Sequence, residues 1–206
     1  MSEYQDYDWA TDELTAAHAY FMQPIIKMLP TDGSPILDVG CGNGSFANYL
    51  IRIGYNVYGT DASDSGISIA SITNPNRFYL QNLSTDDLPT ELNGIQFRTI
   101  ISTEVVEHLY DPRKYIQFCK SILEKSGGGN LIISTPYHGY LKNLALSIFN
   151  AWDKHFTVLW DGGHIKFWSF KTLTQLLREY HFEIVSFKGC GRFPYFWKSM
   201  VINSKI

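Results

Sequence analysis

Cysteine is scarce in this chain of 206 residues, and neither sign of charge is in large excess. The three cysteines are odd in number and far apart, which excludes a disulfide framework and favours a reducing compartment. A net charge of -3 provides no global attraction for nucleic acid, which is therefore not an expected partner. The apolar runs fall short of a membrane span, and residues 1–6 are too polar and acidic for a signal peptide. We therefore expect a cytoplasmic protein.

Further absences narrow the class of ligand and the organisation of the chain. There is no glycine-rich loop that ends in Gly-Lys-Ser/Thr, which disfavours a P-loop. The glycine-rich turn after residue 39 has the spacing G-x-G-x-G rather than G-x-G-x-x-G, which disfavours a nicotinamide-dependent oxidoreductase. No internal repeat, low-complexity tract or linker interrupts the sequence, so we expect one domain over residues 1–206. The sequence carries no signal for an oligomeric state.

What the chain does contain is an apolar strand that runs into three glycines. The segment Ile-Leu-Asp-Val at 36–39 predicts a strand buried on both faces of a sheet. Gly40, Gly42 and Gly44 then allow a sharp turn and the close approach of a ligand to bare backbone. A helix is expected to follow, over about 45–53.

An acidic residue completes this pattern. The next predicted strand, over 56–60, ends at Asp61, which lies 17 residues beyond Gly44. In a parallel sheet this places a carboxylate beside the glycine loop, where it can accept hydrogen bonds from a ribose diol. The pattern therefore predicts a nucleoside-containing cofactor on a Rossmann-like sheet.

Strand and helix signals alternate along most of the chain, which favours a parallel sheet with helices on both faces. We expect strands at 35–39, 56–60, 77–81, 98–102, 130–134, 182–189 and 196–203, and helices at 12–28 (with Thr11 as N-cap), 45–53, 62–71, 112–123, 141–152 and 169–179. Residues 1–30 are expected to form a helical cap, and the aromatic-rich residues 137–168 an insertion that acts as a lid. The expected lid contacts are made by Tyr4, Tyr7 and Trp9 from the N-terminus, and Tyr137 and His138 are expected near the acceptor pocket.

The string D-V-G-C-G-N-G closely resembles motif I of class I S-adenosylmethionine (SAM) methyltransferases. The resemblance extends over roughly residues 34–190 and includes Asp61, the segment D-D-L-P at 86–89 and the segment E-V-V-E-H-L at 104–109. It implies an α/β, Rossmann-like three-layer sandwich. The implied sheet is mostly parallel and seven-stranded, with order 3-2-1-4-5-7-6 and the last strand antiparallel.

The resemblance also implies a SAM site at the carboxyl edge of the sheet. Asp61 would accept both ribose hydroxyls, or cap a helix that begins at Ala62; the two roles are compatible. Asp38 would organise the glycine loop and approach the methionine part, or only cap the turn amides. The acid that often binds adenine is replaced by Asn82 and Leu83, with Asp86 nearby. The implied cofactor residues are Asp38, Gly40, Cys41, Gly42, Asn43, Asp61, Ala62, Asn82, Leu83 and Thr103, and Cys41 is interpreted as a packing residue.

Two acids and a histidine follow the fourth predicted strand. If residues 103–108 begin a helix, Glu104, Glu107 and His108 share one face and can bind a divalent cation. His164 could supply a fourth ligand. This set is similar to the metal site of small-RNA 3′-terminal 2′-O-methyltransferases, and it resembles ubiquinone-biosynthesis O-methyltransferases, some of which are metal-assisted. Three interpretations stay open: a Mg²⁺ or Mn²⁺ site, metal-free contact with the substrate, and a scaffold role.

The chemistry of an alcohol acceptor favours a metal ion or a general base at this position. Methyl transfer from a sulfonium mainly requires positioning, but a hydroxyl must also lose its proton. A metal would lower the pKa of the hydroxyl, or a histidine would act as general base, and His108 and His164 are the candidates. We therefore expect a SAM-dependent O-methyltransferase acting on a small molecule.

Two alternatives are kept. An RNA 3′-terminal 2′-O-methyltransferase would need a basic patch, which Lys142, Lys154, Lys166 and Lys171 could form locally. An eroded glycine loop or a missing ribose acid would favour a non-catalytic SAM-binding module. This sequence has both the intact glycine loop and the acid.

Overall fold

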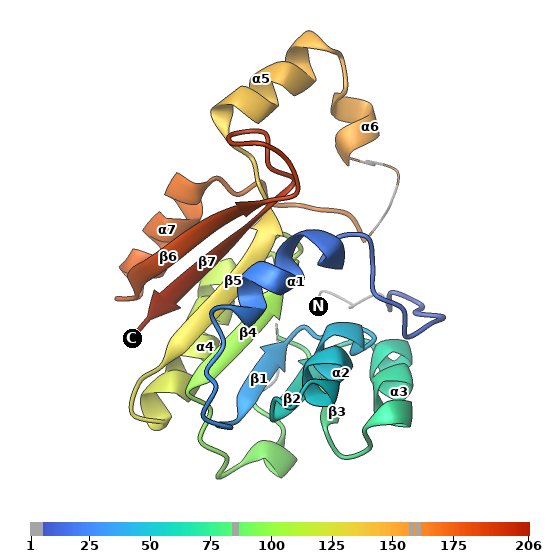
Figure 1. Ribbon diagram of the computed structural model, residues 1–206, viewed down its shortest axis with the longest axis vertical. Coiled ribbons are helices and arrows are strands. Elements are labelled where there is room, and N and C mark those ends of the chain that lie inside the picture. The colour runs from blue at the N-terminus through green and yellow to red at the C-terminus, as the bar shows by residue number, and fades with distance from the viewer. Residues whose placement is uncertain (1–5, 84–86, 157–158, 160–161) are drawn as a thin grey trace.

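The computed structural model describes residues 6–83, 87–156, 159 and 162–206. Within them the chain forms a seven-stranded sheet of order β3-β2-β1-β4-β5-β7-β6 (Figure 1), which confirms the predicted order. The strands are β1 (Ile36–Val39), β2 (Val57–Asp61), β3 (Phe78–Leu80), β4 (Thr99–Thr103), β5 (Asn130–Pro136), β6 (Glu183–Cys190) and β7 (Ser199–Lys205). The first five strands are parallel, and β7 runs antiparallel to both β5 and β6. The carboxyl ends of the parallel strands therefore share one edge, the upper edge in Figure 1.

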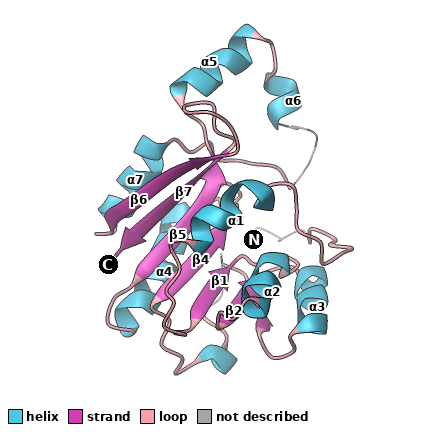
Figure 2. Cartoon of the chain, in the orientation of Figure 1, coloured by secondary structure: helices cyan, strands magenta, loops and turns pink. Residues whose placement is uncertain are grey.

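Helices cover both faces of the sheet and form a three-layer sandwich (Figure 2). They are α1 (His18–Ile26), α2 (Ser45–Arg52), α3 (Asp64–Thr73), α4 (Pro112–Lys125), α5 (Tyr140–Ile148), α6 (Trp152–Phe156) and α7 (Phe170–Glu179), with a 3-10 turn, η1, at Thr90–Leu92. One apolar cluster joins α1, α2 and α3 to the sheet, and a second joins α4 and α7 to the opposite face. Every helix among the described residues is too short or too polar to span a bilayer.

The alternation of β1 shows how the two faces are filled. Ile36 belongs to the cluster that contains Phe21 and Leu50, whereas Leu37 belongs to the cluster that contains Tyr115 and Leu173. Successive side chains of a strand point to opposite faces, so an apolar run is buried on both sides only if helices cover both. All four residues of β1 are buried, as the sequence predicts.

The leading helix is shorter than its sequence predicts, because it begins at His18 instead of residue 12. Ala17 is the N-cap and makes no side-chain cap bond, so the expected cap at Thr11 is wrong. The backbone carbonyls of Thr11 and Glu13 instead accept hydrogen bonds from Nδ2 of Asn43, at 2.8 and 3.1 Å. These two hydrogen bonds therefore hold residues 6–17, which are not helical over most of their length, over the carboxyl edge of the sheet.

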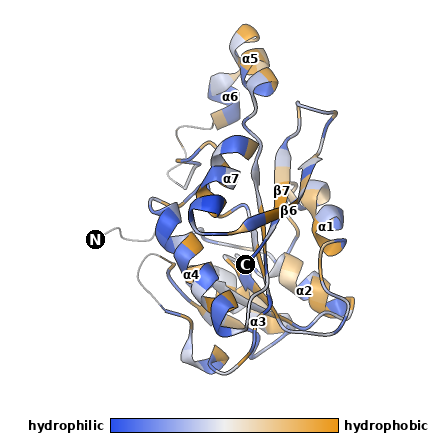
Figure 3. Cartoon of the chain, turned by 90° about the vertical axis from the view of Figure 1, so that its left-hand side faces the viewer, coloured by the Kyte–Doolittle hydropathy of each residue, from blue (hydrophilic) through white to orange (hydrophobic). Residues whose placement is uncertain are grey.

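The expected helix over 141–152 is divided into α5 and α6. The chain turns between them at Asn150, whose φ of 47° is incompatible with a continuing α-helix. Figure 3 shows both helices standing away from the sheet, with apolar residues along α5. Apart from this division and the late start of α1, the predicted helices and strands match the observed ones to within a few residues.

Candidate active site

The glycine loop leaves β1 and turns into α2 with three residues in the left-handed region. Gly40, Gly42 and Gly44 have φ values of 78°, 56° and 68°. A Cβ atom on Gly42 would lie 2.9 Å from Cζ2 of Trp9, so a larger residue would displace the segment that covers the loop. The backbone conformation and the close packing both require glycine at this position.

Asp61 ends β2 beside this loop and holds it in place. Its Oδ2 accepts a hydrogen bond from the amide of Gly42 at 2.8 Å, and its Oδ1 accepts one from the amide of Ser63 at 2.8 Å. Burial raises the pKa of Asp61, while these amide hydrogen bonds act in the opposite direction. The helix cap is Ser63 rather than Asp61, because α3 begins at Asp64 and Oγ of Ser63 accepts from the amide of Gly66 at 2.9 Å.

Asp38 is a buried carboxyl with unused hydrogen-bonding capacity. Its side chain is 1% exposed, and within the described residues its Oδ1 has no hydrogen-bond partner. Burial and the charge of Asp61 raise the pKa of Asp38 to about 8. A buried polar atom without a partner is costly, so Asp38 is suited to a positively charged ligand atom.

The other residues expected at the cofactor site lie at the same edge of the sheet. Ala62 follows β2, Asn82 and Leu83 follow β3, and Thr103 ends β4. Cys41 lies in the glycine loop as a free cysteine, and burial raises its thiol pKa well above the usual value. A protonated thiol is a poor nucleophile, which agrees with a packing role. Asp86 lies outside the described residues.

The segment of residues 6–17 covers the glycine loop (Figure 1). Both Ser63 and Ser65 donate their hydroxyls to Oδ1 of Asp6 at 2.6 Å, and Oγ of Ser65 accepts from the amide of Trp9 at 2.9 Å. The ring of Tyr7 stacks on that of Trp9, with 5.2 Å between centroids. Burial raises the pKa of Tyr7 to about 12, and the charge of Glu107 adds to this rise. Tyr7 is therefore within electrostatic reach of Glu107, whereas Tyr4 lies outside the described residues.

Residues 103–108 form a turn rather than the expected first turn of a helix. Glu104 has a positive φ of 55°, and the amide of His108 donates to the carbonyl of Val105 at 2.9 Å. The predicted shared helix face of Glu104, Glu107 and His108 is therefore wrong. A turn at a strand end directs neighbouring side chains to different partners, which the helical spacing did not anticipate.

The two glutamates of this turn are anchored by hydroxyls of neighbouring strands. Oε1 of Glu104 accepts from Oγ of Ser134 at 2.9 Å and from Oγ of Ser199 at 2.8 Å. Oε2 of Glu107 accepts from Oγ1 of Thr135 at 2.9 Å. Ser134 and Thr135 lie on β5 and Ser199 on β7, so the sheet itself fixes both carboxylates.

Backbone hydrogen bonds bring His164 to the same place. The carbonyl of Glu107 accepts from the amides of Ile165 and Lys166, at 3.0 and 2.9 Å. His164 Nε2 consequently lies 4.0 Å from Oε1 of Glu107, and the rings of His164 and His108 are 4.8 Å apart. Ligand atoms of Glu107, His108 and His164 all lie within 4.8 Å of one another. Glu104 is not part of this group.

The charge state of the group suits either proton transfer or metal binding. Burial and the charge of His108 lower the pKa of His164 to about 4, and burial also lowers the pKa of His108. Both imidazoles are therefore neutral near pH 7, in the form that accepts a proton or binds a metal. Burial, with the nearby Glu104, raises the pKa of Glu107, whose Oε1 has no hydrogen-bond partner among the described residues.

Tyr137 and His138 follow β5 but point to different surroundings. The ring of Tyr137 packs against Trp197, with centroids 5.1 Å apart. His138 lies among aromatic side chains of the insertion, with its ring centroid 5.8 Å from that of Phe156 and 5.2 Å from that of Phe167. Of this pair, only His138 thus packs against Phe156 and Phe167, and the position of both residues near an acceptor stays a prediction.

Some residues of the site give no signal in the sequence. Ser199 lies 95 residues beyond Glu104 and reaches it only because β7 inserts between β5 and β6. Ser134 and Thr135 have an ordinary strand composition, so nothing distinguishes them as supports of two carboxylates. Lys142 was expected in a surface patch, but it is buried.

The chain is similar in sequence and in fold to proteins that are already known. The sequence model of a family described as "Methyltransferase domain" matches residues 13–187. A ubiquinone biosynthesis O-methyltransferase of Cereibacter sphaeroides is 27% identical over 92% of this chain and 75% of its own length. A protein of the same name from Ruegeria sp. is 31% identical over 82% of this chain and 68% of its own length. Magnesium protoporphyrin IX methyltransferase from Synechocystis PCC 6803, solved with bound SAH, superimposes with a TM-score of 0.63 at 19% identity, covering 89% of this chain and 80% of that one, a likeness that shows the fold alone.

Proposed function

Because the chain belongs to the methyltransferase family identified by these comparisons and is a SAM-dependent enzyme, we propose that it methylates a hydroxyl group of a small molecule. The observation that carries this proposal is the group formed by Glu107, His108 and His164 at the carboxyl edge of the sheet. A hydroxyl acceptor needs a group that takes up its proton or that stabilises the oxygen once the proton is lost. This trio offers two neutral imidazoles and a carboxylate. The relatives named as O-methyltransferases support the same acceptor class.

We assign the cofactor to the glycine loop and its acidic neighbours. Asp61 would accept the ribose hydroxyls while its oxygens also hold the loop through Gly42. Asp38 offers a buried oxygen that has no hydrogen-bond partner among the described residues and suits the positively charged amino group of SAM. The ten residues expected at the cofactor site are supported by their common position at one edge of the sheet.

Residues 6–17 and the insertion are proposed as covers of the site. The N-terminal cover is supported by the hydrogen bonds of Asp6 and Trp9 to the start of α3 and by the packing of Trp9 on Gly42. Enclosure of this kind removes water around a reacting sulfonium and holds the acceptor in line with the methyl group.

The same three side chains fit a divalent metal ion. Two neutral imidazoles and one carboxylate are suitable ligands for Mn²⁺ and less so for Mg²⁺, which prefers oxygen. Within the described part of the chain Oε1 of Glu107 accepts no hydrogen bond, which supports this assignment, because an ion would satisfy that oxygen. When bound, a metal would lower the pKa of a hydroxyl placed beside it. Glu104 would act from outside this ligand set, by its charge.

Histidine-based catalysis is the metal-free form of the proposal. The hydroxyl proton passes to an imidazole nitrogen of His164 or His108, and the oxygen forms a bond to the methyl carbon. The carbon–sulfur bond breaks with its electrons left on sulfur. A positioned base of this kind contributes about 10²–10⁴-fold to the rate.

The alternatives are less well supported. The comparisons favour no RNA substrate, and the basic patch considered for RNA loses Lys142, which is buried. A non-catalytic module is disfavoured by the intact glycine loop and by the retention of Asp61.

The deciding experiment measures transfer of a labelled methyl group from SAM to catechols, with EDTA or with added Mn²⁺. His164→Ala is expected to lower kcat by about 10²–10⁴-fold while SAM affinity, measured by calorimetry, changes little. His181→Asn is the matched control, since His181 is exposed and its positive φ of 68° is tolerated by Asn. Full activity in EDTA would contradict the proposed metal site. Equal losses of kcat and SAM affinity in His164→Ala would show that His164 has a structural role.

A further inference from the structure

Ser134 and Thr135 are adjacent residues at the carboxyl end of β5, and they donate their hydroxyls to different glutamates. Oγ of Ser134 donates to Glu104, whereas Oγ1 of Thr135 donates to Glu107. Successive side chains of a strand point to opposite faces of the sheet, so the two carboxylates are held on opposite faces of β5. This arrangement separates Glu104 from the candidate metal-binding group that contains Glu107.

The pairing of β5 with β7 shows which face belongs to which glutamate. Thr135 pairs with Met200, which belongs to the apolar cluster beneath α4 and α7. Ser134 pairs with Val201, which belongs to the cluster beneath α1. Residues directly opposite each other in an antiparallel pair share a face. The carboxylate of Glu107 therefore lies on the face that α4 and α7 cover.

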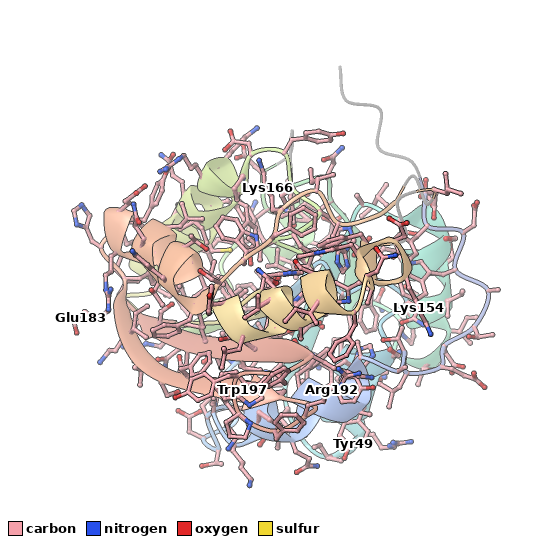
Figure 4. The ribbon with its side chains drawn as sticks, turned by 90° about the horizontal axis from the view of Figure 1, so that it is seen from above. Tyr49, Lys154, Lys166, Glu183, Arg192 and Trp197 are labelled. Atoms are coloured by element: carbon pink, nitrogen blue, oxygen red, sulfur yellow. The ribbon has the colours of Figure 1, made fainter. Side chains whose placement is uncertain are left out.

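The backbone of Glu107 is held by the segment that carries His164. The carbonyl of Glu107 accepts from the amides of Ile165 and Lys166, at 3.0 and 2.9 Å. Figure 4 looks onto this edge of the sheet and shows Lys166 on the side of α4. These two bonds fix the main chain of Glu107, but they do not fix the orientation of its carboxylate.

The hydroxyl of Thr135 supplies that remaining constraint. The last torsion of a glutamate has broad preferences, so a carboxylate that is held at neither oxygen can rotate. Oε2 of Glu107 accepts from Oγ1 of Thr135 at 2.9 Å, and Oε1 lies 4.0 Å from Nε2 of His164. Among the described residues Oε1 has no hydrogen-bond partner. Thr135 is suited to this task because it is buried and because a β-branched side chain is stiff at χ1.

We propose that Thr135 is a positioning residue of the metal site formed by Glu107, His108 and His164. Its hydroxyl holds Oε2 of Glu107 and so presents Oε1 to the two imidazoles. This inference rests on the metal-dependent form of the proposed function. Hydrogen bonds that orient a metal ligand in advance strengthen metal binding, and their loss typically weakens it by about 10–100-fold.

Calorimetric titration of Mn²⁺ into the full chain tests this role without catalysis. Thr135→Val keeps the shape of the side chain but removes its hydroxyl, and it should weaken Mn²⁺ binding by about 10–100-fold. Thr135→Ser retains the hydroxyl and should restore most of the affinity. The affinity for SAM should stay unchanged in both variants, because Thr135 is assigned to the metal site and not to the cofactor site.

Two further variants serve as controls. Glu107→Gln should abolish most of the Mn²⁺ heat, which would show that the binding measured is that of this group. Thr174→Val makes the same substitution at a buried threonine of α7, whose hydroxyl donates to the carbonyl of Phe170 at 2.7 Å. It should leave the Mn²⁺ affinity unchanged.

Each outcome decides the proposal. Unchanged Mn²⁺ affinity in Thr135→Val, or an equal loss in Thr135→Ser, would overturn it, because the hydroxyl would then not be what orients Glu107. A parallel loss of SAM affinity would give Thr135 a structural role and would equally overturn it. If Thr135→Val does not fold, Thr135→Cys, which keeps only a weak donor, carries the same test and should weaken Mn²⁺ binding several-fold. Absence of Mn²⁺ binding in the unmodified chain would also overturn it, whereas methyl transfer in EDTA would leave the proposed O-methylation intact.

Discussion

Asp61 links the cofactor assignment to the geometry of the glycine loop. Its carboxylate accepts from the backbone of Gly42 and Ser63, and the assigned ribose would add two further donors. We expect Asp61→Ala to weaken SAM binding by roughly a hundredfold, about 3 kcal/mol, because two hydrogen bonds to a charged group are lost. Calorimetric titration with SAM measures this change.

A neighbouring acid provides the control for Asp61. Asp64→Ala removes an exposed carboxylate from the first turn of α3 and should alter SAM affinity little. An affinity for SAM that is the same in Asp61→Ala and in the unmodified chain would contradict the ribose assignment.

Asp38 connects the cofactor site to the pH dependence of stability. Burial and the charge of Asp61 raise its folded-state pKa to about 8, compared with 3.8 for a free carboxyl. Between these two values the folded protein retains a proton that the unfolded chain has lost. Ionisation of Asp38 therefore favours unfolding. The contribution of Asp38 to the free energy of unfolding decreases as pH rises from about 4 to about 8.

The corresponding variant is Asp38→Asn, which cannot ionise. Without cofactor, its free energy of unfolding should rise relative to the unmodified chain as pH increases across this window, by at most about 5 kcal/mol. Urea unfolding at pH 5 and pH 8 measures the difference. A constant difference at the two pH values would show that Asp38 does not carry the raised pKa.

At the scale of elements, the N-terminal segment shows how an irregular stretch can contribute to a site. It is held by side chains of the loop and of α3, namely Asn43, Ser63 and Ser65. Burial tends to raise the pKa of Asp6, but hydrogen bonds from the Ser63 and Ser65 hydroxyls lower it overall. The segment therefore remains attached through an ionised Asp6 at neutral pH.

The contact of Trp9 with the glycine loop leads to a prediction for this element. Trp9→Ala is expected to weaken SAM binding about tenfold, because the indole shields the loop from water and an aromatic of this size buries a large apolar area. Leu14→Ala, at a 43% exposed position of the same segment, is the matched control. Calorimetry measures the SAM affinity of both variants. Equal SAM affinities in Trp9→Ala and Leu14→Ala would contradict the proposal that residues 6–17 cover the site.

At the scale of the whole molecule, cofactor binding should stabilise the fold. The glycine loop, Asp61 and residues 6–17 come from separate parts of the chain, so a SAM site formed by them exists only in the folded state. SAM at a hundred times its Kd should add about 2.7 kcal/mol to the free energy of unfolding. For a chain of this size that raises Tm by roughly 5–11 °C, at about 2–4 °C per kcal/mol.

Thermal unfolding with and without cofactor checks this expectation. NADH at the same concentration is the comparison ligand, because the spacing of Gly40, Gly42 and Gly44 disfavours a dinucleotide. A stabilisation by NADH as large as that by SAM would contradict the cofactor assignment.

Local patterns in the sequence were sufficient to predict the sheet, the glycine loop and the position of Asp61. These features depend on local rules: apolar runs form buried strands, glycine permits positive φ, and the carboxyl ends of parallel strands meet at one edge. The boundary errors at residue 12 and at 141–152 arose where backbone carbonyls found tertiary partners or where one residue, Asn150, adopted positive φ.

Which side chains of the site meet depends on contacts between distant segments of the chain. Helical spacing grouped Glu104 with Glu107 and His108, but the observed turn and the hydroxyl of Ser199 direct Glu104 elsewhere. The place of His164 depends on two amides that bond to the carbonyl of Glu107, a contact between segments far apart in the chain. The burial of Lys142 is not what its residue type predicts, because the packing of the insertion, and not the preference of lysine for water, decides which side chains are buried.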